Sequence, residues 1–168
     1  ATGFQALNAN TGSNNTATGS QTLFYNNSGY YNTAAGAGAL LHNIGGYQNT
    51  ATGLQALASN TDGSNNTAEG FDALYYSTGS NNIALGANAG INLTTGSNNI
   101  DIGAPGVAGE SAKIRIGTKG TQTATYIAGI VGKTVASGTR VGVMIDGKGK
   151  LGTVVSSARY KQAIKPMD

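Results

Sequence analysis

Polar and small apolar residues alternate in a five-residue motif, Asn-Thr-Ala-x-Gly or Asn-Ile-x-x-Gly, that recurs through residues 1–103. Its Asn residues are separated by 17, 17, 17, 16 and 17 positions: Asn15, Asn32, Asn49, Asn66, Asn82 and Asn99. A second Gly precedes each motif, as Gly12 precedes the first, and an x-Ala-Leu or x-Thr-Leu element lies between most copies. A recurring period of this kind predicts stacked structural repeats.

A repeat of this length is too short for a pair of helices, and it fits one coil of a β-solenoid. We expect an all-β fold in which each coil has two short strands joined by tight turns, so that coils stack as a parallel β-solenoid or β-roll. Within the motif, side-chain alternation places the Ala of the Ala17 column inside and the flanking Thr residues outside.

The repeated Asn residues have two structural explanations. Their side-chain amides could form a hydrogen-bonded ladder from coil to coil, or Asn could simply tolerate left-handed turn geometry. Neither explanation gives them a catalytic role.

The outward-facing positions change character along the chain. They are mostly Thr in the first four copies, whereas the last two copies carry Ile83, Leu85, Ile100 and Ile102. We therefore expect neighbouring chains, or the start of the next region, to cover the apolar end of this face.

A composition change follows the repeats and predicts two regions: a β-solenoid at 1–103 and a β-strand stalk at 104–155. The stretch "GAPGVAGES" separates the first two. Beyond it, "KIRIG", "TATYIAGI", "RVGVMID" and "KLGTVV" are predicted strands, and "DGKGK" is a predicted hairpin turn.

Composition supports this picture. The 168 residues include 27 Gly, no Trp and no Cys, with 39% hydrophobic and 10% charged residues, so any core consists of small side chains. No apolar run is long enough to cross a membrane. All ten Lys and Arg residues follow residue 112, but they are scattered, with Tyr126 and Tyr160 as the accompanying aromatics, so we expect no nucleic-acid binding.

The repeats "NTATGLQAL" and "NNIALGANAG" resemble those in the head domains of trimeric autotransporter adhesins. The similarity covers residues 1 to about 103. It implies parallel β-rolls packed three around an axis, and with them a homotrimer.

The end of the chain, "LGTVVSSARYKQAIKPMD", resembles the junction before the intramolecular chaperone domain of phage endosialidases and tail fibres. That resemblance implies that residues 156–168 are the start of an intramolecular chaperone domain, which trimerises the chain and then releases itself by cleavage. Ser156 would be the nucleophile, with Ser157 as its rival and Lys161 as the assisting cation. A helix start with Ser156 or Ser157 as N-cap is the structural alternative.

Aromatic residues in the turns are candidates for stacking on sugar rings, while packing against neighbouring coils or chains is the alternative. The candidates are Phe24, Tyr25, Tyr30, Tyr31, Tyr47, Tyr75 and Tyr76.

These features favour a non-enzymatic homotrimeric fibre segment, extracellular, on a virion tail or a bacterial surface. We expect interchain contact to be densest from about residue 83 to 155.

The enzymatic alternative is a polysaccharide depolymerase using two carboxylates, for which Glu69 and Asp72 are the nearest pair in sequence. An ice-binding Thr array is disfavoured because the second outward column is not uniformly Thr. No cofactor is expected, and no metal site, because His42 is the sole His.

Overall fold

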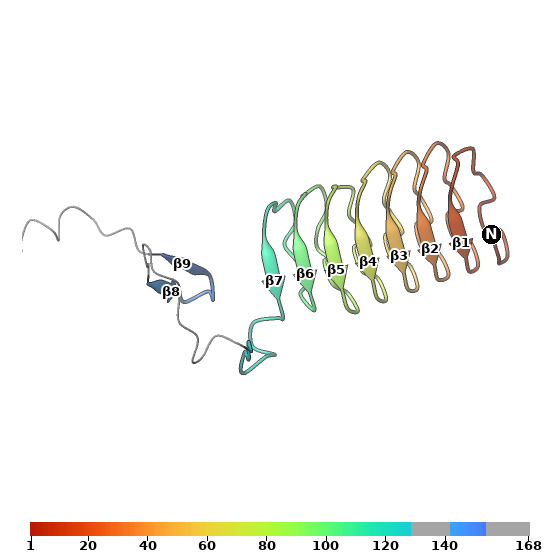
Figure 1. The fold of residues 1–168 in the computed structure, drawn as a ribbon. Coiled ribbons are helices and arrows are strands. Elements are labelled where there is room, and N and C mark those ends of the chain that lie inside the picture. The colour runs from red at the N-terminus through yellow and green to blue at the C-terminus, as the bar shows by residue number, and fades with distance from the viewer. Residues whose placement is uncertain (129–141, 154–168) are drawn as a thin grey trace, which may run out of the picture. The chain divides into compact units, whose positions relative to one another are not determined.

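The computed structural model describes residues 1–128 and 142–153. The chain divides into two compact units, residues 1–124 and 125–168, and each is described by itself. The described residues contain nine strands, and no helix is found among them (Figure 1).

Seven three-residue strands of the first unit form one parallel sheet, each pairing with the next along the chain (Figure 1). They are β1 (Thr16–Thr18), β2 (Thr33–Ala35), β3 (Thr50–Thr52), β4 (Thr67–Glu69), β5 (Ile83–Leu85), β6 (Ile100–Ile102) and β7 (Ile114–Ile116). The register joins equivalent motif positions, for example Ala17 to Ala34 and Ala34 to Ala51. The predicted parallel β-solenoid, with one sequence repeat per coil, is confirmed.

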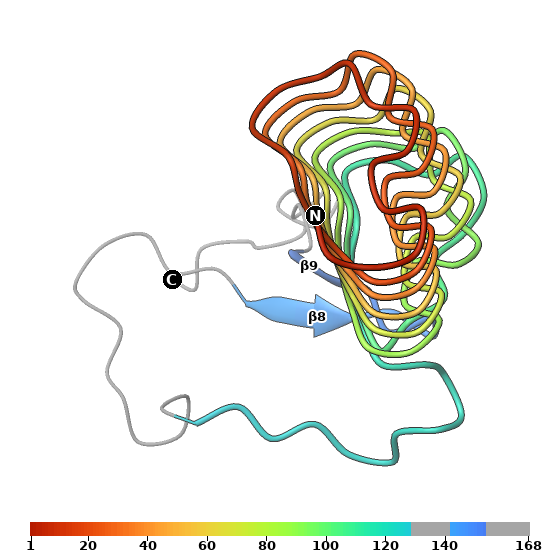
Figure 2. The same ribbon diagram turned by 90° about the vertical axis from the view of Figure 1, so that its right-hand side faces the viewer.

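Each coil has one strand rather than the two expected. The segment where the second strand was expected, such as 20–25, forms consecutive turns, and Gln21 and Leu23 adopt φ angles of 55° and 51°. Left-handed backbone is costly for residues with a side chain. It is compensated here by hydrogen bonds between coils, as from the Leu23 N–H to the Ala39 carbonyl at 3.0 Å. Viewed along the stack, successive coils repeat a similar looped outline, each offset from the one before (Figure 2).

Three columns of apolar side chains fill the core, and all are almost completely buried. They are the Ala residues of the strands, the Leu residues of the turns, and a second set of Ala residues in the turns: Ala39, Ala56, Ala73 and Ala89. The Leu column departs from its period in the fifth coil, where Gly90 takes the place of Leu and Leu93 fills the core from three positions further on. A Cβ on Gly90 would lie 2.7 Å from a methyl carbon of Leu74, which is too close. Only a residue without a side chain therefore fits at this position once Leu93 fills the core.

The predicted Asn ladder exists, but it runs through the backbone. The side-chain carbonyl of Asn32 accepts the backbone N–H of Asn49 at 3.0 Å, and its side-chain amide donates to the carbonyl of Gly46 at 2.9 Å. Equivalent bonds join the whole column from Asn15 to Asn99. Buried backbone groups at this corner are thereby satisfied, as folding requires.

A second ladder, which the sequence reasoning missed, lies beside the first. The amide of Asn43 donates to the side-chain carbonyl of Asn26 at 2.6 Å, and that of Asn60 donates to Asn43 at 2.7 Å. Each of these amides also donates to the Gly three positions on, Gly46 and Gly63 respectively. One glycine carbonyl is therefore held by two Asn side chains.

Strand β7 lies beyond residue 103, the predicted end of the repeats, and extends the same sheet. In the second unit, β8 (Val143–Ile145) pairs antiparallel with β9 (Leu151–Thr153). The side chain of Asp146 accepts the backbone N–H groups of Lys148 and Lys150, both at 2.9 Å, which closes the predicted hairpin turn. The predicted strand at 123–130 is absent from its described part, 123–128.

Candidate interaction surfaces

The outer face of the sheet becomes apolar at its C-terminal end, as expected. Five aliphatic side chains of β5, β6 and β7 are exposed and lie in register on neighbouring strands: Ile83, Leu85, Ile102, Ile114 and Ile116. We call this set the aliphatic face. Its exposure is greatest at Ile114 and Ile116, with 70% and 73% of each residue accessible to solvent. No part of the described first unit covers it, and contiguous exposed apolar side chains of this kind are typical of interaction sites.

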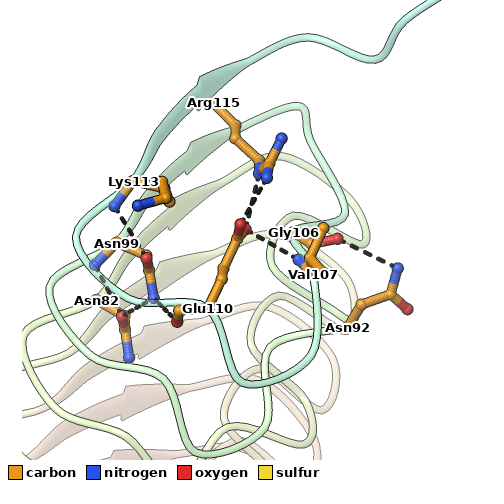
Figure 3. Close-up of polar contacts among 8 residues, drawn as sticks. All are labelled: Asn82, Asn92, Asn99, Gly106, Val107, Glu110, Lys113 and Arg115. Carbon is orange, nitrogen blue, oxygen red and sulfur yellow. Dashed lines mark hydrogen bonds and ion pairs between the residues drawn. The ribbon is translucent and has the colours of Figure 1, made fainter. Parts of the chain in front are cut away.

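A charged cluster closes the C-terminal end of the core. Asp101 occupies the column that is Ala in β1–β5, and it is completely buried. Neither of its carboxylate oxygens has a hydrogen-bond partner among the described residues. Arg115 lies opposite it in β7 but binds Glu110 through two hydrogen bonds, of 2.7 and 2.5 Å (Figure 3).

The pKa of Asp101 is raised to about 6. Burial is the main cause, because a carboxylate loses its hydration in the core. The negative charge of Glu110 also raises the pKa, and the positive charge of Arg115 opposes both effects. The pKa of Glu110 is lowered, chiefly by its hydrogen bond to Arg115.

The aromatic candidates fall into two groups on different parts of the coil. In one, Tyr30 and Tyr47 stack face to face, with ring centres 5.1 Å apart and planes at 5°, and Tyr31 meets Tyr30 edge to face. The packing alternative is therefore realised for this pair. Both rings keep an exposed edge, and Tyr31 is more exposed than either.

The second group lies at the end of the turn segment. Phe24 meets Tyr25 edge to face, and Tyr25 stacks on His42 at 5.0 Å and 11°. Tyr75 and Tyr76 repeat the edge-to-face arrangement of Phe24 and Tyr25 three coils further on. From the sequence, His42 is weighed above only as a metal ligand. Its position one full repeat after Tyr25 is nevertheless a signal that the two rings stack.

The remaining candidate residues are not assembled into a site by the described structure. Ser156, Ser157 and Lys161 lie outside the described residues. Glu69 is exposed on β4, whereas Asp72 is half-buried in the following turn and no hydrogen bond joins them. Within residues 1–128 and 142–153, no three His, Cys, Asp or Glu side chains are grouped to hold a metal. The same ranges contain no helix suited to crossing a bilayer.

Comparison with protein-family models, curated proteins and solved structures found no match.

Proposed function

We propose that the chain is a segment of a homotrimeric extracellular fibre, on a virion tail or a bacterial surface, which presents or forms a receptor- or glycan-binding tip. The observation that carries this proposal is the aliphatic face. A single thin sheet leaves five aliphatic side chains in water, and burial against further copies would remove this apolar area from solvent at about 25 cal/mol per Å².

The position of the aliphatic face indicates which part of the solenoid would contact other copies. It is confined to β5–β7, while the same columns of β1–β3 carry Thr and Ala, so copies would associate at one end of the solenoid. The number three comes from the resemblance of the repeats to trimeric adhesin heads and of the C-terminal sequence to chaperone junctions. Under this proposal, release of the chaperone by Ser156 with Lys161 completes assembly.

Sedimentation equilibrium tests the assembly. We expect the full chain to sediment with three times the mass of one chain at micromolar concentration. Ile102→Lys places a charge on the aliphatic face and should shift the species to monomer. Thr52→Lys is the matched control because it changes the equivalent position three strands earlier, in β3, and should leave the trimer intact.

A stable wild-type monomer would refute the trimer. Equal effects of the two lysine variants would refute the assignment of the aliphatic face as the contact.

A further inference from the structure

One column of equivalent turn residues has an aromatic ring in the first, second and fourth coils and a serine in the third, which leaves a gap between rings. Its first four members recur at the repeat interval: Tyr25, His42, Ser59 and Tyr76. Their backbones stack in one pattern, because the N–H of each of the first three donates to the residue before the next member, at 2.9 to 3.0 Å. Ser59 therefore lies between His42 and Tyr76 along the stack.

The rings on the two sides of this gap have similar local surroundings. Tyr25 and His42 are stacked with their planes at 11°. Tyr76 meets Tyr75 much as Tyr25 meets Phe24, with ring centres 4.5 and 4.4 Å apart and planes at 68° and 71°. Because the coils repeat one backbone pattern, we expect Tyr76 to present its ring as Tyr25 does, and so to face His42.

The width of the gap follows from the step between coils. Neighbouring rings are 5.0 Å apart in this column and 5.1 Å in the column of Tyr30 and Tyr47. Two steps place His42 and Tyr76 about 10 Å apart, near twice the spacing of adjacent strands. A ring entering midway would lie about 5 Å from each face, which is a favourable stacking distance.

We propose that His42, Ser59 and Tyr76 form a slot that binds an uncharged pyranose ring, sandwiched between the two aromatic faces. The Ser59 hydroxyl, half-buried at the floor, offers a donor and an acceptor to a sugar hydroxyl. Tyr76 is 57% exposed, and His42 is exposed as well. Neither wall is therefore buried beneath other side chains.

The charge of the protein around the slot determines which ring-shaped ligands it would accept. Residues 1–112 contain five acidic residues and no Lys or Arg, so the slot lies in a negative region. Phosphate and carboxylate groups are repelled there, which disfavours nucleotides and acidic sugars. This inference rests on the glycan-binding part of the proposed function but not on the trimer, because one chain supplies the whole slot.

Saturation-transfer NMR on the full chain tests the slot, with the methyl glycosides of glucose, galactose and N-acetylglucosamine as neutral probes. We expect millimolar binding of at least one, with transfer strongest at its ring C–H protons.

Ser59→Tyr should fill the slot with a ring that continues the stack and weaken binding at least tenfold. Thr52→Tyr adds the same side chain on the sheet face and should have no effect. His42→Ala and Tyr76→Ala each remove one wall and should also abolish binding, which covers the case in which Ser59→Tyr misfolds.

Three outcomes would overturn the slot. Adenosine monophosphate or a methyl sialoside binding more tightly than every neutral probe would refute the ligand class. Unchanged binding by Ser59→Tyr, His42→Ala and Tyr76→Ala would refute the location while leaving the glycan-binding fibre in place. No binding of any probe to the wild type would refute both the slot and the glycan-binding part of the proposed function, whereas sedimentation still decides the trimer.

Discussion

Asp101 of β6 lies opposite Arg115 of β7 in the parallel register, yet the Arg115 guanidinium binds Glu110. The buried carboxyl is left without a hydrogen-bond partner in the described structure. A buried charge without a partner is expensive, so protonation of Asp101 relieves the core.

The first prediction concerns pH. The ordinary pKa of the Asp101 carboxyl is 3.8 and its folded value is about 6, so folding takes up a proton between these values. Stability should therefore fall as the pH rises from about 4 to about 7, by up to about 3 kcal/mol for a difference of about two pH units. Thermal melting across this range measures the effect. Glu110, with its lowered pKa, acts in the opposite sense at lower pH, because its contribution is lost as pH falls below its ordinary 4.5.

Asp101→Asn keeps the shape of the side chain and removes the titration, and Asp101→Ala restores the column residue. Both variants should melt at higher temperature than the wild type at pH 7 and lose the fall between pH 4 and 7. If the melting temperatures of both variants fell between pH 4 and 7 in parallel with the wild type, another group would control the pH response.

The second prediction concerns the Asn ladder. Asn49→Ala removes the acceptor of the Asn66 backbone N–H and a donor to the Gly63 carbonyl, both buried. The loss of two hydrogen bonds, with a buried N–H left unpaired, should cost about 2 to 4 kcal/mol. Urea unfolding of Asn49→Ala and of the exposed control Asn27→Ala measures this cost. Similar midpoints for the two variants would contradict a stabilising ladder.

The third prediction compares two adjacent glycines. A Cβ on Gly46 would lie 2.4 Å from the Gly63 carbonyl oxygen of the next coil. A Cβ on Gly45 would meet only the ends of side chains, Asp62 at 2.9 Å and Ser28 at 3.7 Å. Neither residue has a positive φ. Gly46→Ala should push the coils apart and cost more than about 3 kcal/mol, and Gly45→Ala should cost less than about 1 kcal/mol. Thermal melting distinguishes them, and equal losses would show that the coils tolerate separation at this corner.

Sequence periodicity was sufficient to predict the strand formed by the Asn-Thr-Ala-x-Gly motif, its register and the buried Ala column, because one residue type recurs at each of these positions. It did not predict the turns around Leu23, since left-handed backbone at Leu is stabilised only by the next coil. The second ladder had a visible signal in Asn26, Asn43 and Asn60, each three positions before a Gly.

The candidate sites were predicted less completely. The aliphatic face follows from the alternation of outward residues, whereas the role of the turn aromatics in ligand binding stays a prediction. The slot depends on the absence of a ring at Ser59 and on the orientation of the Tyr76 ring. Neither feature can be seen by listing the aromatic residues of the sequence. The change from Ala to Asp at Asp101 was visible in the motif "NNIDIG", but its burial required the structure.

The shortened interval from Asn66 to Asn82 shows where this architecture accommodates a change in length. The preceding coil has Thr61 and Asp62 between Asn60 and Gly63, whereas only Thr78 separates Ser77 from Gly79. Strands β4 and β5 nevertheless keep the same register, with Thr67 paired to Ile83. Insertions and deletions can therefore accumulate at this corner without altering the stack, and a peptide epitope displayed there, at Thr61 or Thr78, would project from a rigid scaffold at a height set by the choice of coil.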